Sequence, residues 1–339
     1  MRLSRGGALL AIVAAGIGAG HVDRASASQL IDRNATGVTL QLNAQGEALL
    51  TYRAGGVLKH VLAWGAINAV PSTQTSRQVK LGLDYSGGYG KYFKQNAATQ
   101  VLVRRYQAIK GTTGYLANPV VKQLHEAQQA AALYWKTAFD GGCGPYDGPS
   151  LAWAIITCTA ADGTNWAVQE WRRELPNYGV APTADQAVWE LRLAHWSGPL
   201  PVLTVHTDWA WHQWDHLYGS LTYRGEPAFG FKSTSGGNPL DTFGRNVYID
   251  TYGSAYGSGW MRENSVLTHT HTGAFCYSVN PHGDHPAGKG TTYRITVIGP
   301  GLTPDVMWQG PAPGRYDATA DQLANAEIAH LDDRLCGPN

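Results

Sequence analysis

The sequence predicts a mainly β protein, a β-sandwich or jelly roll with one central and one C-terminal α-helix. Short segments of alternating apolar and polar residues recur along the chain, with Gly and Pro between them. The chain contains 41 Gly, which suits tight turns because Gly reaches positive φ without steric cost. With 12 Trp and 17 Tyr against 3 Met, the composition also favours sheets with aromatic surfaces.

Residues 1–27 have the pattern of an export signal. A basic start with Arg2 and Arg5 precedes an apolar run of small residues at 8–19, and Ala25-Ser26-Ala27 matches a leader cleavage site. Cleavage after Gly20 is a weaker match. The run is too short and too rich in Gly for a transmembrane helix. We therefore expect a secreted protein whose mature chain, residues 28–339, is a single mainly β domain with no membrane insertion.

Charge gives no reason to expect nucleic acid as a partner. The 26 Lys and Arg nearly balance 25 Asp and Glu, and charged residues make up only 15% of the chain. A net charge of +1 provides neither the basic surface that binds phosphate backbones nor one that binds anionic membranes.

Four cysteines in an exported chain predict two disulfides. The sequence allows three pairings, and we favour Cys143–Cys158 with Cys276–Cys336, because the first two enclose a compact region rich in Gly and Pro. The chain has no Cys-x-x-Cys motif, which argues against a zinc ribbon or a thioredoxin-like centre.

The first regular elements form a predicted meander in residues 38–64, which could be a subdomain. Its strands are 38–42, 48–52 and 57–64, with polar or Gly-rich turns between them. A central helix follows, with Asn118 as its N-cap and Pro119 in its first turn. Its apolar stripe, expected to pack on a sheet, is Val120, Leu124, Ala127, Ala131, Tyr134 and Ala138.

The second half of the chain is predicted to form mainly strands. They are 165–171, 187–196, 200–206, 217–223, 228–233, 246–252, 274–279 and 292–298. A hairpin is expected across Arg224-Gly225-Glu226. A C-terminal helix starts at Thr319, which forms a capping box with Gln322, and its buried stripe is Ala324, Ile328, Leu331 and Leu335.

Potential chemistry concentrates in residues 204–271, where aromatic, acidic, basic and imidazole side chains lie close together. If 246–252 is a strand, Val247 and Ile249 face the core, whereas Tyr248, Asp250 and Tyr252 share the other face. A carboxylate between two phenols is typical of a sugar-binding surface, although a solvated strand face is the plain alternative.

Asp250 and Glu263 are the best-placed carboxyl pair for glycoside hydrolysis. Glu263 would be the acid, with its pKa raised by burial against Trp260, and Asp250 the nucleophile or base. The alternative is a lyase in which Arg245 neutralises a uronate and either Tyr248 or His269 removes the proton. The aromatic residues expected to bind substrate are Tyr252, Tyr256, Trp260, Trp209 and Trp211.

Histidines leave a metal site open but undefined. His269 and His271 form a His-x-His pair, and His212 and His216 are four residues apart, yet no spacing matches a complete site. No cofactor is expected: residues 283–290 imitate a phosphate-binding loop but end in Gly290 where Ser or Thr is required.

These patterns predict a secreted protein that binds or acts on an extracellular polysaccharide or cell-wall glycan, as a hydrolase or a lyase if it is an enzyme. Two alternatives remain. One is a non-catalytic structural or adhesive module of the envelope, and the other is a metal-dependent enzyme that uses histidines.

Overall fold

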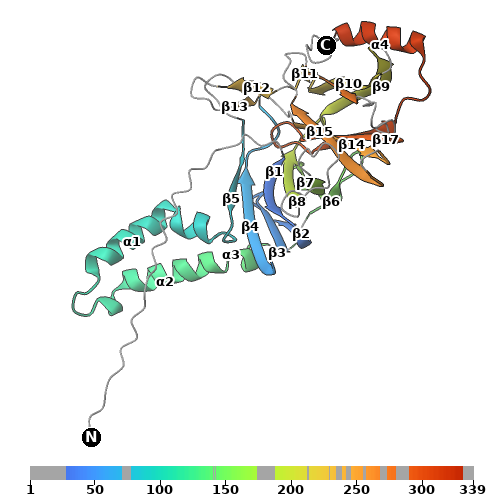
Figure 1. Cartoon of the computed structure of the whole chain (residues 1–339). Coiled ribbons are helices and arrows are strands. Elements are labelled where there is room, and N and C mark those ends of the chain that lie inside the picture. The colour runs from blue at the N-terminus through green and yellow to red at the C-terminus, as the bar shows by residue number, and fades with distance from the viewer. Residues whose placement is uncertain are drawn as a thin grey trace.

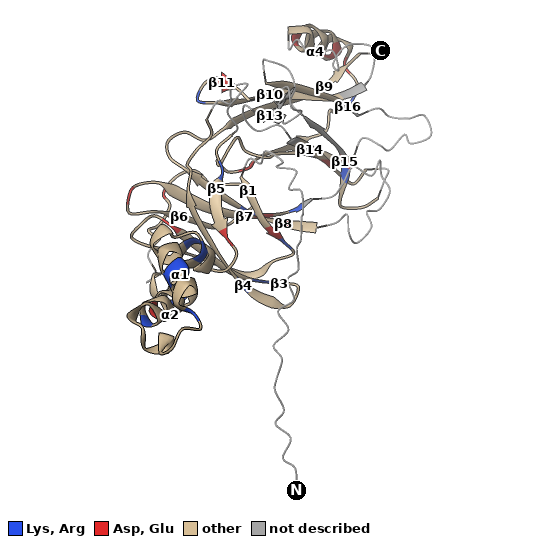
Figure 2. Ribbon diagram, turned by 90° about the vertical axis from the view of Figure 1, so that its left-hand side faces the viewer, with Lys and Arg blue, Asp and Glu red and all other residues tan. Residues whose placement is uncertain are grey.

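The computed structural model describes residues 28–70, 78–139, 141, 143–173, 188–211, 214–228, 230–233, 239–241, 246–254, 257–267, 273–279 and 290–330. In this part of the chain the protein is mainly β, as predicted, with four antiparallel sheets of four strands and a two-stranded ribbon (Figure 1). Charged residues occupy little of the sheets (Figure 2). None of the described helices is both long and apolar enough to cross a bilayer.

Two sheets come mostly from the first half of the chain. The meander sheet contains β2 (Thr36–Leu42), β3 (Ala48–Ala54), β4 (Val57–Gly65) and β5 (Leu81–Asp84) in that order, which confirms the predicted meander. The β7 sheet has the order β1-β8-β7-β6, from β1 (Gln29–Arg33), β8 (Val188–Trp196), β7 (Asn165–Arg173) and β6 (Ala154–Thr159).

The other sheets come from the second half. The β14 sheet has the order β15-β14-β17-β18, from β15 (Trp260–Leu267), β14 (Asn246–Tyr252), β17 (Thr292–Val297) and β18 (Val306–Pro311). In the β10 sheet, β10 (Trp214–Tyr223) pairs with β9 (Val202–Ala210), β11 (Glu226–Pro227) and β16 (Ala274–Val279). The ribbon joins β12 (Gly230–Ser233) to β13 (Pro239–Asp241).

The turn between β10 and β11 confirms the expected hairpin in part. Arg224 and Gly225 both have positive φ, 54° and 80°, as a two-residue hairpin turn of type I′ requires. The returning strand ends at Pro227, however, and the next segment, Gly230–Ser233, pairs with β13 instead of β10.

Apolar clusters give the order of the layers. Trp166 and Leu191 of the β7 sheet share one core with Leu50 of the meander sheet. Trp171, on the opposite face of β7, packs with Tyr248 of the β14 sheet. Another core joins the β14 and β10 sheets; its members include Val247, Ile249, Ile295, Leu217, Leu221 and Phe275. Sandwich-like packing therefore repeats through four layers, and the meander is the first of them.

The central helix is one arm of a helical hairpin inserted after β5 (Figure 1). Asn118 caps α2 (Pro119–Ala132) by accepting from the Val120 amide at 3.0 Å, as predicted. The helix breaks at Leu133 before the short α3 (Tyr134–Thr137). Its partner, α1 (Ala97–Ile109), was not predicted; the short η1 (Gly90–Lys94) and η2 (Tyr115–Ala117) complete the insertion.

Glu47 fastens the base of this hairpin to the meander sheet. Its buried carboxylate forms an ion pair with Lys91 and accepts hydrogen bonds from Tyr92, Tyr134 and Asn43. Burial alone would raise the pKa of Glu47, but the hydrogen bonds from Lys91 and the two phenols hold it below its ordinary value.

The C-terminal helix, α4 (Ala318–His330), packs along β9. The predicted capping box is wrong: the Asp317 carboxylate accepts from the amides of Thr319 and Ala320, at 2.7 and 3.1 Å. Ala324 and Ile328 are buried as expected, whereas Leu331 and Leu335 lie outside the described residues.

The disulfide between Cys143 and Cys158 is present, with Cα atoms 5.3 Å apart, and it fastens the segment after the hairpin to β6. Cys276 is also disulfide-bonded. Its expected partner, Cys336, is outside the described residues.

Candidate functional site

The centre of the site is a carboxylate between two guanidinium groups. The register of the β14 sheet sets Asp250 directly opposite Arg262 on β15 and Arg294 on β17. Arg262 forms a close ion pair with one carboxylate oxygen of Asp250, and Arg294 Nη2 lies 3.2 Å from the other. Asp250 and Arg262 are buried, whereas the Arg294 side chain keeps 16% of its exposure.

Aromatic rings enclose both cations. The Arg262 guanidinium lies 4.8 Å from the ring centre of Tyr248. Arg294 lies 4.1 Å from Trp260 and 4.8 Å from Trp153, so two indoles flank it. Such contacts favour a desolvated cation because the ring faces carry negative potential. We call this group, which consists of Tyr248, Asp250, Arg262, Arg294, Trp153 and Trp260, the arginine–aromatic site.

The Arg294 end of the site reaches the surface. Tyr252, which is 46% exposed, meets Trp260 edge to face with ring centres 5.2 Å apart. Trp153 holds its indole beside Arg294 from a backbone with φ of 60°, a region that a bulky residue rarely adopts. The buried Nε1 donor of Trp153 has no hydrogen-bond partner among the described residues.

Glu263 belongs to a β-bulge beside the site. The register shifts between Ile249 and Asp250, so Ile249 pairs with Asn264, Asp250 pairs with Arg262, and Glu263 is the extra residue. Burial raises the pKa of Glu263 to about 7, and the Thr251 and Ser254 hydroxyls oppose this rise.

The structure gives Asp250 and Glu263 different neighbours. Asp250 contacts two arginines, whereas Glu263 faces Thr251 and Ser254. The charge of Asp250 contributes least to the raised pKa of Glu263. Glu263 Oε1 is buried without a hydrogen-bond partner among the described residues, and burial raises the pKa of this carboxyl to about 7.

Of the other residues predicted for the site, Tyr248, Tyr252 and Trp260 do lie together at the β14 sheet. Trp209 and Trp211 lie elsewhere, on β9 and just after it. Trp209 Nε1 donates to the Gly314 carbonyl at 3.1 Å, and the Trp211 amide donates to Asn325 on α4 at 2.8 Å. Their visible role is to hold the C-terminal segment against the β10 sheet. Arg245, Tyr256 and His269 are outside the described residues.

Arg294 and Trp153 had no sequence signal as site residues. Arg294 alternates with the core residues Tyr293 and Ile295, so the pattern predicts only that it faces away from that core. Its position beside Asp250 depends on the pairing of two strands that are 44 residues apart in the chain.

The described residues contain no group of three or more His, Cys, Asp or Glu that could hold a metal ion. His216 is buried on β10. His212, His271 and the other histidines of the predicted clusters lie outside the described part of the chain.

In comparisons with known proteins, the chain matches no protein-family model, no curated protein and no solved structure.

Proposed function

We propose that the protein is exported and binds an acidic extracellular polysaccharide, with a uronate carboxylate at Arg294 and the sugar ring against Trp260 and Tyr252. The leader pattern of residues 1–27 and the Cys143–Cys158 disulfide support export. The observation that carries the binding proposal is Arg294, a partly exposed, planar cation held between two indoles.

The chemistry of these groups favours an acidic over a neutral glycan. A guanidinium matches a carboxylate because its N–H groups form a planar fork, and charge-assisted hydrogen bonds are stronger than neutral ones. Asp250 and the two indoles fix the orientation of Arg294, so little side-chain entropy is lost on binding. Trp260 and Tyr252 add apolar ring surface beside the cation.

Cleavage by β-elimination is a second candidate, favoured by the same arginine. A guanidinium on the uronate carboxylate would make the neighbouring C–H more acidic. A base would take that proton, a C=C bond would form, and the glycosidic C–O bond would break, with the leaving oxygen gaining a proton. Of the two candidate bases, Tyr248 and His269, only Tyr248 is among the described residues. Hydrolysis has less support, because both carboxylate oxygens of Asp250 are already engaged by arginines.

The test compares binding of the purified protein to polygalacturonate, alginate and a neutral glucan. We expect binding to the two uronates that weakens as salt rises, since the contact is ionic. Arg294→Gln should weaken it about tenfold or more, the range for one hydrogen bond to a charged group, and Arg294→Lys should restore part of the loss. Arg53→Gln, at an exposed arginine of β3, is the matched control and should change nothing.

Absence of binding to any uronate polymer, or unchanged binding by Arg294→Gln with its fold intact, would remove the proposal. Product analysis separates the modes of action. Unsaturated products that absorb in the ultraviolet indicate elimination, and new saturated reducing ends that disappear in Asp250→Asn and Glu263→Gln indicate hydrolysis. Binding without turnover indicates a non-catalytic module.

A further inference from the structure

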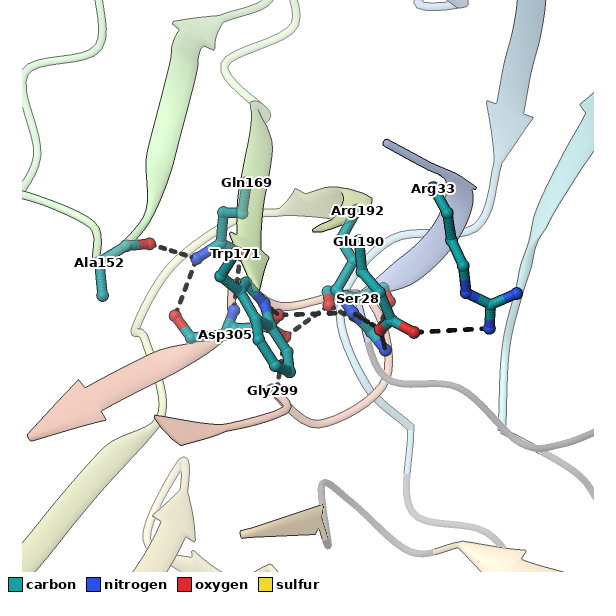
Figure 3. A network of polar contacts seen from close by, with 9 residues as sticks. All are labelled: Ser28, Arg33, Ala152, Gln169, Trp171, Glu190, Arg192, Gly299 and Asp305. Carbon is teal, nitrogen blue, oxygen red and sulfur yellow. Dashed lines mark hydrogen bonds and ion pairs between the residues drawn. The ribbon is translucent and has the colours of Figure 1, made fainter. Parts of the chain in front are cut away.

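A second polar cluster lies between the β7 and β14 sheets, around Asp305 in the segment before β18 (Figure 3). The Asp305 carboxylate accepts hydrogen bonds from Ser28 Oγ at 2.5 Å, the Gly299 amide at 2.9 Å and Trp171 Nε1 at 2.7 Å. Gln169 pairs with the Asp305 backbone in both directions, at 2.8 and 3.0 Å. Asp305 is 1% exposed and Ser28 is completely buried.

The two arginines of this cluster, Arg192 and Arg33, pair mainly with the carboxylate of Glu190. Arg192 Nη2 and Nε donate to Glu190 at 2.7 and 3.1 Å, and Arg33 approaches Glu190 from the edge at 3.5 Å. Arg192 Nη1 donates to the Ser28 carbonyl at 2.8 Å. Asp305 has only a 3.9 Å approach from Arg192 Nε, so its three carboxylate hydrogen bonds described above all come from neutral donors.

A buried carboxylate with neutral donors is unfavourable unless a cation stands beside it. Burial raises the pKa of Asp305, and Arg192 with the Ser28, Gly299 and Trp171 donors offsets only part of that rise. An additional positive charge beside Asp305 would therefore stabilise its buried carboxylate.

Ser28 directly follows the Ala25-Ser26-Ala27 cleavage pattern. Hydrolysis of the Ala27–Ser28 peptide bond consumes one water, leaves a carboxylate on Ala27 and creates an α-amino group on Ser28. This nitrogen is bonded to the same Cα as the hydroxymethyl group that reaches Asp305. Covalent geometry keeps it within about 6 Å of the Asp305 carboxylate, and rotation about the Cα–C bond of Ser28 can bring it closer.

We propose that leader removal at Ala27 completes the fold: the α-ammonium of Ser28 becomes a buried cation paired with Asp305. The pair fastens the start of β1, in the β7 sheet, to the segment that leads into β18, in the β14 sheet. This inference rests on the export half of the proposed function and is independent of glycan binding.

Burial of Ser28 sets the order of events. A peptidase cannot reach a bond at a completely buried residue, so cleavage precedes docking of β1 against β8. A folded chain that retains the leader is expected to resist removal of the leader at this bond.

The pH dependence has a defined sign. Asp305 and Arg192 contact Ser28 directly, from the segment between β17 and β18 and from β8. The groups next to these two are Gly299 and Trp171 at Asp305, and Glu190 and Tyr248 at Arg192. Pairing with Asp305 raises the pKa of the amine in the folded state. The added stability is therefore complete below the unfolded value, about 7.7, and is lost as pH rises through the folded value.

The experiment uses two chains released from a fusion by a protease that leaves no extra residue. One begins at Ser28, and the other retains Ala27 in front of it. Competitive acetylation at about pH 7 should modify the Ser28 α-amine at least about tenfold more slowly in the folded chain than in urea, which corresponds to a pKa raised by about one unit. The Ala27 chain should show no such protection and should unfold at a lower temperature.

Asp305→Asn should abolish the difference in unfolding temperature between the two chains, and Asp147→Asn, at an exposed carboxylate, should preserve it. If Asp305→Asn does not fold, protection of the amine in the two parent chains decides alone. Equal acetylation and equal unfolding temperatures overturn the proposal. So does a mature protein whose amino terminus, measured by mass spectrometry of the exported chain, is not Ser28.

Discussion

The two faces of the β7 sheet show two ways to fill a buried layer. Towards the meander sheet, the layer is apolar; its members include Trp166, Val168, Leu191 and Leu193 with Leu50, Tyr52 and Val61. Towards the β14 sheet, the layer contains ion pairs; its members include Glu190, Arg192, Asp305, Asp250 and Arg262. These charged residues are as buried as the apolar ones, so burial alone does not distinguish the two layers.

The difference lies in specificity. Apolar contacts stabilise roughly in proportion to the area removed from water and tolerate small shifts. Burying an ion pair costs hydration free energy, and the attraction between the two charges offsets that cost only at one geometry. The net contribution of such a pair is therefore small, but breaking it is costly. We therefore expect the apolar layer to supply most of the stability and the polar layer to fix how the β14 sheet sits on the β7 sheet.

Alternation along β7 and β8 produces both faces at once. Leu191 and Leu193 point one way, and Glu190 and Arg192 point the other. A shift of one residue in the register of β8 would place both charges in the apolar core.

The largest effect is expected from breaking the polar layer. Arg192→Met removes the main ion pair of the buried Glu190, which keeps the 3.5 Å approach of Arg33, and also the 3.9 Å approach to Asp305, so the free energy of unfolding should fall by about 3–5 kcal/mol in urea at neutral pH. The loss should shrink in acid, because protonated carboxyls no longer need the cation. Arg53→Met, at an exposed arginine, is the control. A loss below about 1 kcal/mol would show that this layer is not held by charge.

A comparable but slightly smaller loss is expected in the apolar layer. Leu191→Ala removes a fully buried side chain and should lower the free energy of unfolding by about 3 kcal/mol. Because no charge is involved, the loss should be the same at about pH 5 and about pH 8. Leu58→Ala, at a leucine that is 47% exposed, should change stability by less than about 0.5 kcal/mol. If the stability loss of Leu191→Ala depended strongly on pH, this would contradict the proposal that only the polar layer depends on charge.

The smallest of the three effects is a gain at Glu263. Its pKa is about 7 in the folded protein against an ordinary 4.5, so folding favours the protonated form and stability falls as pH rises between these values. Glu263→Gln should therefore raise the free energy of unfolding by about 1–2 kcal/mol at about pH 8 and by little at about pH 5. Glu126→Gln, at an exposed glutamate of α2, is the matched control. Equal effects at both pH values would contradict the raised pKa.

Local patterns predicted the elements that alternation or capping defines. Val247 and Ile249 face the core as expected, and Asn118 begins the central helix. The α1 helix escaped prediction: among its residues only Thr99 is buried, so no strong apolar stripe marks it.

Long-range pairing could not be predicted. Arg294 reaches Asp250 across 44 residues, and Ser28 reaches Asp305 across 277. The bulge at Glu263 could not be predicted either. Strict alternation of side chains along a strand assumes that each residue of β15 has one partner on β14, and a bulge breaks that rule. The sequence therefore placed Tyr248 and Asp250 on one strand face and pointed to Trp260 as a site residue, but it could not show that two arginines converge on the carboxylate.

We expect the helical hairpin, α1 and α2, to open as a cooperative unit separate from the sheets. Apart from Thr99 and Ala131, none of the residues of α1 and α2 is buried, and the hairpin is held to the sheets through Glu47 at its base. Opening α1 and α2 exposes little core, so their amides should exchange with solvent far faster than those of β3, β7 and β8. We therefore expect the sheets to set the global stability and the hairpin to open locally without global unfolding.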